Sequence, residues 1–475
     1  MEYKWTVLTV TTVGVLMAGI DSRIVIVGFP EVAAALHANA EEAIWFTQSY
    51  MLGSTVALLL IGRMTDIYGR VKIYNLGFVV FTVGSFLSSA SLNPAMLIGF
   101  RAIQGLGSGV IFTNSAAIIT DATPKDRLGL SLGVNQLGFR FGGMAGLTLS
   151  GLILSALDWR ALFYINVPIG IFGTVWAHRR LKEIAKLDKG RGMDWVGISS
   201  FMCFVTSLLL ALTYTAYGIS QSTLYVVILL ALISMVSITV FVWQERRSRE
   251  PMLDLGLLKI REFTAGVSAL LLNAIAWGAV LLLLSLYLQL SVGLSPFDAG
   301  IRILPLEIAF LASGPLSGLF SDRAKYLVPL TTSGLALTSI SLFLFSTVGE
   351  TTPYIYTAAY MVLVGIGSGL FVSPNIRTIM ASVPIERRGI ASAFRAMLWS
   401  VGFTVSLSIA VLFMTFTAPY SLITSMITSS LNPLTIPLHD RVLFVESLRN
   451  TYVWLGIINS LAIPFVLVKV KLPAG

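Results

Sequence analysis

The stretch that decides the fold is GRMTDIYGRVK, Gly62 to Lys72. Apolar segments long enough to cross a membrane lie on both sides of it. The stretch places two arginines, an aspartate and a lysine in a short link, and its glycines allow a tight turn. So short a link joins the flanking helices as an antiparallel pair, with the charges at one membrane face. An ordinary basic loop of a membrane protein is the simpler interpretation of this stretch taken alone.

The composition argues against a water-soluble globular protein. Of the 475 residues, 56% are hydrophobic and 12% are charged, whereas soluble domains carry about 25% charged residues. One cysteine, Cys203, excludes an internal disulfide, and three scattered histidines argue against a metal site. No cofactor is expected, because the chain lacks a phosphate-binding loop that ends in Lys-Ser or Lys-Thr.

The hydropathy pattern predicts an all-α integral membrane protein. A transmembrane helix needs about 20 apolar residues, and fourteen segments meet this requirement. They are residues 5–30, 43–65, 73–91, 95–121, 127–155, 160–178, 195–217, 222–243, 263–290, 298–321, 326–347, 354–381, 388–417 and 451–469.

The basic residues support this count, because they gather in alternate loops. With the N-terminus in the cytoplasm, most of the 32 lysines and arginines fall on the cytoplasmic side. The opposite side receives only Arg160, Arg302, Arg441 and Arg449. We therefore expect a multi-pass plasma-membrane protein with both termini in the cytoplasm. This topology also accounts for the net charge of +9 without a nucleic-acid partner.

The chain contains an internal repeat. QGLGSG at 104–109 resembles VGIGSG at 364–369, and RLG at 127–129 resembles RRG at 387–389 at the same offset. The repeat predicts two six-helix halves, residues 1–181 and 251–475, with a two-helix insertion at residues 182–250. The second half is expected to carry a long external loop at 418–449, which either forms a short interfacial helix or covers the outer mouth.

The stretch that opens this section resembles the conserved loop between the second and third helices of the major facilitator superfamily. Glycine, acidic and basic residues all fall at the family spacing. The resemblance implies that this loop acts as a conformational latch. The residues that would form it are Gly62, Asp66, Gly69 and Arg70.

Two further motifs resemble the fourteen-helix drug:proton antiporters of this superfamily. GIDSRIVIVGFP, at 19–30, matches their first-helix signature at Asp21, although Arg23 departs from it. RAIQGLGSG, at 101–109, matches the fourth-helix motif, whose arginine is linked to proton transfer. A charge this deep in a membrane costs about 3 kcal/mol or more, so Asp21 should face the bundle interior with a partner or a water path. The resemblance makes Asp21 and Arg101 a proton-coupling pair, and a structural ion pair is the alternative.

The resemblance to the drug:proton antiporters is weaker in the span 127–155. GGMAGLTLSG, at 142–151, lies where antiporters of the family carry Gly-Pro-x-x-Gly-Gly, and it lacks the proline and one glycine. This loss weakens the antiporter assignment. DWRALFYINVPIG, at 158–170, matches the family well.

The charged residues inside the spans indicate the type of substrate. Glu307 is the second deep acid, in a region where multidrug relatives place an additional membrane acid, and it is a further candidate for proton coupling. Basic residues outnumber these acids, and a planar guanidinium suits carboxylate, sulfate or phosphate binding. The expected substrate-binding residues are Arg23, Arg140, Arg377 and Arg395. The alternative is that several of them reach an interface or bind backbone carbonyls.

These features together predict a secondary active transporter that exports amphipathic or organic anionic compounds in exchange for protons, by alternating access. The expected partners are a small-molecule substrate, protons and the lipid bilayer, and the protein is expected to act as a monomer. An organic-anion symporter or uptake carrier on the same fold is the main alternative. A polytopic membrane enzyme is a remote alternative, because the chain shows no convergent set of histidines and acids, so we do not expect an enzyme.

Overall fold

The computed structural model describes residues 3–124, 128–184, 194–216, 221–248, 255–321, 327–384, 387–428 and 437–467. This described part is helical and contains no strand. Within it, twelve helices are long and apolar enough to cross a membrane. The helices α2 and α17 are also long but are not among these twelve.

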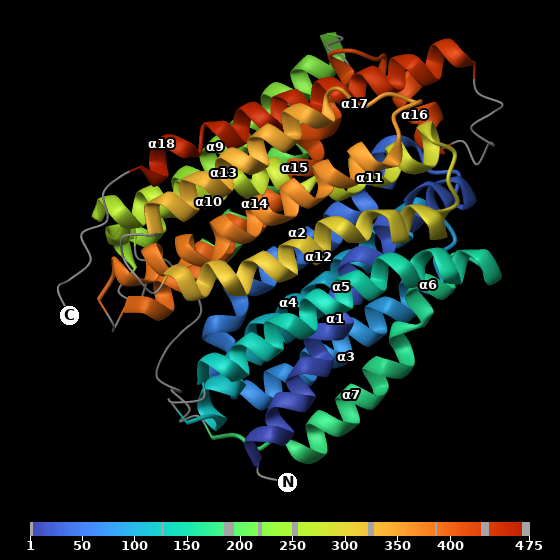
Figure 1. The fold of residues 1–475 in the computed structure, drawn as a ribbon. Coiled ribbons are helices and arrows are strands. Elements are labelled where there is room, and N and C mark those ends of the chain that lie inside the picture. Colours follow the sequence, from blue (N-terminus) through green and yellow to red (C-terminus); the bar gives the residue numbers. More distant parts are fainter. Residues whose placement is uncertain are drawn as a thin grey trace. The chain divides into compact units, whose positions relative to one another are not determined.

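The chain divides into two compact units. The first comprises Met1–Trp195 together with the short segments Leu294–Ile301 and Ile427–Ser430. Its helices, blue to green in Figure 1, are α1 (Tyr3–Ala35), α2 (Ala40–Tyr68), α3 (Arg70–Ser89), α4 (Pro94–Ala122), α5 (Leu128–Ala156), α6 (Ala161–Tyr164) and α7 (Asn166–Arg180).

The second unit comprises Val196–Gly293, Arg302–Met426 and Leu431–Gly475, so the helices of the predicted insertion group with it. From α8 onward the elements are α8 (Trp195–Ala216), α9 (Gln221–Arg247), η1 (Leu255–Lys259), α10 (Arg261–Gly278), α11 (Val280–Leu286), the π-helical turn η2 (Tyr287–Ser291), α12 (Pro296–Ser321), α13 (Leu327–Phe345), α14 (Tyr354–Ala381), α15 (Arg388–Thr415), α16 (Tyr420–Thr428), α17 (Leu438–Ser460) and α18 (Ile463–Val466).

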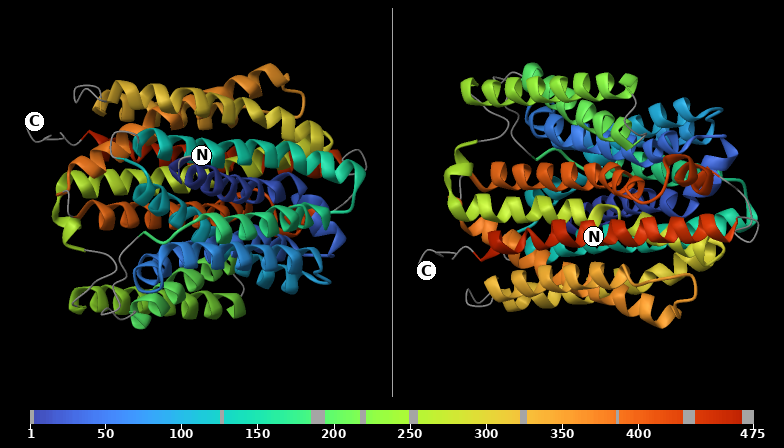
Figure 2. Two further views of the ribbon diagram at one scale, coloured as in Figure 1. Left: turned by 90° about the horizontal axis from the view of Figure 1, so that it is seen from below. Right: turned by 90° about the horizontal axis from the view of Figure 1, so that it is seen from above.

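The packing within the two units follows one scheme. In the first unit, α1 packs on α5 and α3 packs on α4. In the second unit, α10 packs on α15 and α13 packs on α14 in the same way. The long helices of each unit run side by side along most of their length (Figure 2). The second unit therefore repeats the helix pairing of the first.

Glycines of the repeated motif bring the helices close together. In α4, Gly105 lies against the backbone of Tyr50 in α2, so an added Cβ would overlap the Tyr50 carbonyl oxygen. In α14, Gly365 lies against the Leu306 carbonyl of α12 in the corresponding way. Helices that meet without side chains between them gain van der Waals contact, which is a main source of association in a membrane. The motif is therefore a packing device in both units.

The structure differs from the sequence-based prediction near the C-terminus. The last span was predicted at 451–469 after a loop at 418–449, whereas α16 lies in that loop and α17 begins at Leu438. Proline is absent between Leu438 and Ser460, so the helix continues. The buried side chains of Phe444, Leu448 and Leu455 form one stripe along α17. The weak amphipathic pattern at 440–450 is thus the first part of α17.

Two other predicted spans are interrupted. The span 160–178 divides at Ile165 into α6 and α7. The span 263–290 breaks at Ala279, between α10 and α11, and ends in the π-helical turn η2. At the break, the Ala279 N–H donates to the Ser406 hydroxyl oxygen of α15 at 2.9 Å. A side chain that bonds into the helical ladder is a recognised cause of such a break.

We expect Gly105→Ala to lower the stability of the first unit by about 1–3 kcal/mol, because overpacking a close contact forces the backbones apart. Thermal unfolding of the purified protein in detergent measures the effect. Gly99→Ala on the same helix is the matched control, since Gly99 has no neighbour within 4 Å of an added Cβ. Equal unfolding temperatures for the two variants would show that the Gly105 contact does not hold α2 and α4 together.

Candidate functional site

The first unit contains a completely buried ion pair. The Asp21 carboxylate on α1 has no exposed surface, and the Arg101 side chain on α4 is 1% exposed. Arg101 Nη1 donates to Asp21 Oδ2 at 2.7 Å. The two residues that the sequence predicts as a proton-coupling pair therefore meet.

The carboxylate binds two further donors through its other oxygen. Gln104 Nε2 on α4 donates to Asp21 Oδ1 at 2.8 Å, and Asn166 Nδ2 on α7 donates to the same atom at 2.9 Å. A buried carboxylate is costly unless it is paired and hydrogen-bonded. These three donors satisfy Asp21 in its charged form.

The guanidinium of Arg101 is held from several directions. Its Nε donates to the Phe46 carbonyl of α2 at 3.1 Å, and its Nη1 also donates to Gln104 Oε1 at 2.7 Å. The Tyr50 ring lies 4.2 Å from the Arg101 Cζ atom, which is within cation–π range. Arg101 and Gln104 are three residues apart, so they share one face of α4.

Ser85 of α3 completes this network. Gln104 Nε2 donates to Ser85 Oγ at 2.9 Å, and Ser85 in turn donates to the Phe163 carbonyl of α6 at 2.9 Å. We call Asp21, Ser85, Arg101, Gln104 and Asn166 the charged node. It joins α1, α3, α4 and α7 through buried side chains.

The second unit contains a buried network of neutral side chains between its helices. Asn273 Nδ2 on α10 donates to Asn459 Oδ1 on α17 at 2.8 Å. Asn459 Nδ2 donates to the Leu335 carbonyl and to Ser339 Oγ of α13, both at 2.9 Å. All of these side chains are buried. We call Asn273, Ser339 and Asn459 the amide node.

The repeat explains why this second node carries no charge. At the offset that relates the two glycine motifs, Met361 corresponds to Arg101 and Val364 corresponds to Gln104. Met361 and Val364 are fully buried. Asn273 lies on α10 and contacts an asparagine of α17, Asn459. In the same way, Asp21 lies on α1 and contacts an asparagine of α7, Asn166. The ion pair thus occurs in one half of the repeat.

The predicted latch is described in part. Gly69 joins α2 to α3 with a φ of 98°, a conformation that glycine adopts readily. Arg70 Nη1 contacts Asp121 Oδ1 at 2.5 Å, which ties the start of α3 to the end of α4. The surroundings of the Gly62 and Asp66 positions lie outside the described residues. Asp121 is a partner that the sequence-based prediction missed.

Of the remaining predicted site residues, Arg23 and Arg140 belong to the first unit, and Glu307, Arg377 and Arg395 belong to the second. Arg23 and Glu307 are buried, whereas Arg140, Arg377 and Arg395 are partly buried. Arg23 lies against Gly143 of α5, where its Cγ atom would be 3.3 Å from an added Cβ. The hydrogen bonds from Gln104 on α4 and Asn166 on α7 to Asp21 were missed, although both residues belong to motifs that match the family.

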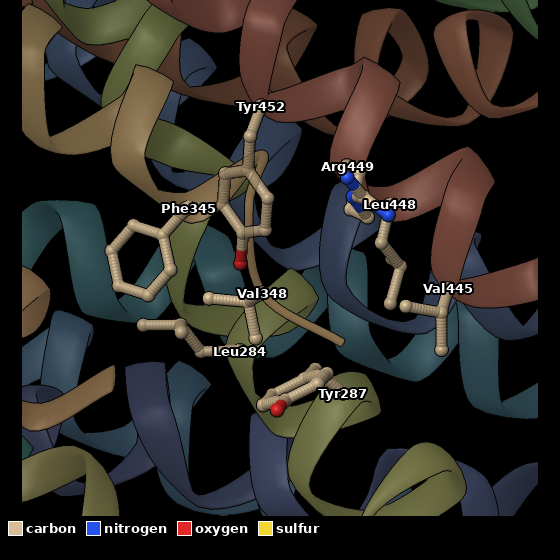
Figure 3. Close-up of a pocket in the computed structure, with 8 residues that line it drawn as sticks. All are labelled: Leu284, Tyr287, Phe345, Val348, Val445, Leu448, Arg449 and Tyr452. Carbon is tan, nitrogen blue, oxygen red and sulfur yellow. The ribbon is translucent and has the colours of Figure 1, made fainter. Parts of the chain in front are cut away.

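The two described cavities belong to the second unit and are small. One is bounded by Leu284, Tyr287, Val348 and Tyr452 among others and has a volume of about 10 Å³, the space of one water molecule. Figure 3 shows the Tyr452 hydroxyl pointing toward Leu284 and Val348, and this buried oxygen has no hydrogen-bond partner. The other cavity, beside Glu262 and Asn375, has the same volume. Neither cavity is large enough for an organic substrate.

We expect Arg101→Met to destabilise the protein by about 3–5 kcal/mol, because it leaves the Asp21 carboxylate buried without its cation. The double variant Asp21→Asn/Arg101→Met removes both charges and should recover a large part of this loss. Unfolding in detergent, by heat or by added sodium dodecyl sulfate, measures both. If the double variant unfolds as early as Arg101→Met alone, the charge of Arg101 is not what stabilises Asp21.

Comparison with solved structures identifies the fold. A crystal structure of a D-xylose–proton symporter superimposes with a TM-score of 0.69 at 16% identity, over 99% of this chain and 98% of that chain. A crystal structure of the peptide transporter PepTSo gives a TM-score of 0.68 at 14% identity, over 99% of each chain. At such low identity the likeness establishes an all-helical transporter fold and nothing about the substrate.

Three curated relatives are bacterial transporters. A riboflavin transporter of Clostridioides difficile is 30% identical over 85% of this chain and 87% of its own length. The tetracenomycin C resistance and export protein of Streptomyces glaucescens is 27% identical over 84% of this chain and 73% of its own. Multidrug resistance protein 3 of Bacillus subtilis is 27% identical over 83% of this chain and 77% of its own length.

The family model agrees with the relatives and with the fold. It covers residues 11–407, which include the charged node and both glycine motifs. The chain is therefore a transporter of the major facilitator superfamily.

Proposed function

We propose that this protein exports amphipathic or organic anionic compounds across the plasma membrane in exchange for protons, by alternating access. The observation that carries the proposal is the buried pair of Asp21 and Arg101. The names of several relatives, which include multidrug resistance and export proteins, support efflux.

The charged node supplies a means of coupling. A proton on Asp21 neutralises the carboxylate, so the attraction to Arg101 is lost while the cation stays buried. A buried cation without its counter-ion is strongly unfavourable, which favours a rearrangement of α1 against α4. Return of the proton to water restores the pair. The occupancy of one carboxylate thereby selects between two arrangements of the first unit, and this is the requirement for alternating access.

We further propose that α2 and α17 cross the membrane, which gives fourteen spans with both termini in the cytoplasm. With 29 residues, α2 is about 43 Å long at the rise of an α-helix. With 23 residues, α17 is about 35 Å long. Both exceed the hydrocarbon thickness of about 30 Å. The halves would then be residues 1–181 and 251–475, with residues 182–250 as an insertion that acts as a spacer.

The contact between Arg70 and Asp121 supports a latch at the cytoplasmic ends of α3 and α4. Arg70 also donates to the Ala117 carbonyl at 3.3 Å, so it caps the last turn of α4. A cation at this helix end is favoured by the helix dipole. The bond lies at a loop that joins α2 to α3, and its breakage would free that loop when the first unit rearranges.

Uptake of an organic anion on the same fold is the alternative, and one observation favours it. The span α5 lacks the proline and one glycine of the antiporter motif, and its remaining glycines have a packing role. Gly142 and Gly146 lie against the backbone carbonyls of Leu16 and Ile20 in α1. Close helix packing therefore accounts for these glycines without an antiport mechanism. The direction of transport relative to the proton gradient separates the two proposals.

Proton coupling can be tested with purified protein in liposomes that enclose a pH-sensitive dye. Under an imposed pH gradient, addition of a transported compound should trigger proton movement. Asp21→Asn should reduce this response to that of protein-free liposomes, because the amide cannot bind the proton. Asp158→Asn is the matched control, since Asp158 is exposed and paired with Arg160. A full response from Asp21→Asn would refute the role of the charged node in coupling.

The charge of the substrate can be tested in the same liposomes with matched panels of organic anions and lipophilic cations. Arg140→Ala and Arg395→Ala should each lower the anion-driven response by about tenfold, as expected for the loss of one charge-assisted hydrogen bond. Arg302→Ala is the control, because Arg302 stacks on Tyr354, with its Cζ 5.1 Å from the ring centroid. A response to cations alone would assign the arginines a structural role.

A further inference from the structure

Arg395, on α15 in the second unit, has one unsatisfied buried donor. Its Nε atom is buried without a hydrogen-bond acceptor. Among the residues that the structure describes, no carboxylate forms an ion pair with it. An unpaired arginine within a membrane span is costly and marks a site for an anion. A planar guanidinium binds a carboxylate or phosphate through two parallel hydrogen bonds.

Three aromatic rings gather on the same part of this unit. Trp277 of α10 has its ring centroid 6.3 Å from that of Trp399 and 5.9 Å from that of Phe403. Trp399 and Phe403 are themselves 5.7 Å apart. All three interplanar angles lie between 40° and 48°, so the rings are tilted and do not stack on one another. Trp277 is buried, whereas Trp399 and Phe403 are each partly exposed, so a flat guest can reach these two rings.

The helical register places these rings beside Arg395. Arg395, Trp399 and Phe403 follow one another at intervals of four residues, so they form one stripe along α15. One helical turn is about 5.4 Å long. A guest whose ring lies against Trp399 and Phe403 therefore needs an anionic group about one turn away. The length of one helical turn is close to the distance across a single aromatic ring and its substituent.

The backbone next to Trp277 is irregular. The helix is interrupted at Ala279, two residues after Trp277, and the break is held by Ser406 of the same α15. Gly278 lies against the Phe403 carbonyl and Ser406, where a side chain would not fit. Broken helices in membrane transporters line substrate sites. The interruption, the three rings and the Arg395 guanidinium thus lie on one stripe of α15 or against it.

We propose that Arg395, Trp277, Trp399 and Phe403 form a binding site for planar aromatic compounds that carry a carboxylate or another anionic group. The site rests on the proposed transport of organic anions and narrows it to a class of substrate. The anionic group binds the Arg395 guanidinium and the ring lies against the tilted aromatic side chains. Trp399 also packs against a buried core cluster of the second unit that includes Leu270 and Phe371.

The test is equilibrium binding of 2-naphthoate to the purified protein, with no proton gradient. Cyclohexanecarboxylate probes the charge alone and 2-naphthalenemethanol probes the ring alone. Arg395→Gln should weaken 2-naphthoate binding by at least about tenfold, which corresponds to the loss of a charge-assisted hydrogen bond. The same variant should leave 2-naphthalenemethanol unchanged. Trp399→Leu should weaken both naphthalene compounds and leave cyclohexanecarboxylate unchanged.

The controls are Arg302→Gln and Trp454→Leu, because Trp454 stacks on Phe413 away from these residues. Arg395→Lys keeps the charge without the planar fork and should bind 2-naphthoate with intermediate affinity, which separates recognition from misfolding. Unchanged 2-naphthoate affinity in Arg395→Gln would overturn the site, as would cyclohexanecarboxylate binding as tightly as 2-naphthoate. Binding as expected without proton movement would refute the proposed exchange and leave the site intact. Anion-driven proton movement that Arg395→Gln does not change would refute the site alone.

Discussion

The ion pair between Asp21 and Arg101 is the interaction on which the first unit depends. Neither side chain reaches water, so each needs the other to remain charged. Around them, Gln104, Asn166 and Ser85 supply hydrogen bonds from three other positions in the bundle. A buried polar network of this kind holds its members in one arrangement. The loss of one member therefore disturbs helices that are far apart in the sequence, and this makes the pair suitable for coupling.

The close packing of the helices makes this network possible. Glycines at 105 and 107 let α4 approach α2 and α3 so closely that backbone atoms are in contact. At that separation, the side chains of Arg101 and Gln104 can reach α1 and the Phe46 carbonyl of α2. With larger residues in place of the glycines, the same polar side chains would be too far from their partners. The glycine motif therefore packs the helices together and also brings the charged side chains of Asp21 and Arg101 within reach of each other.

The sequence predicted much of the fold and part of the site. Hydropathy placed the long helices within a few residues along most of the chain, because a membrane span has a nearly fixed length. It misplaced the start of α17, since charged residues at 440–449 interrupt the apolar run while the helix itself continues. The pairing of Asp21 with Arg101 was predicted, because a deep charge needs a counter-charge. The contributions of Gln104, Asn166 and Asp121 were missed, since they depend on the rotation of each helix about its axis.

The amide node has an electrical consequence. A carboxylate that gains and loses a proton changes the charge of its surroundings, and moving one elementary charge across a membrane potential of about 100 mV involves about 2.3 kcal/mol. Asn273 and Asn459 hold their helices together with dipoles alone. Their contact therefore carries no net charge and does not depend on a proton that titrates near neutral pH. Of the two nodes, only the charged node contains a carboxylate that can gain or lose a proton. In the proposed mechanism, the membrane potential and the pH gradient therefore act on the first unit through the charged node and leave the amide node unchanged.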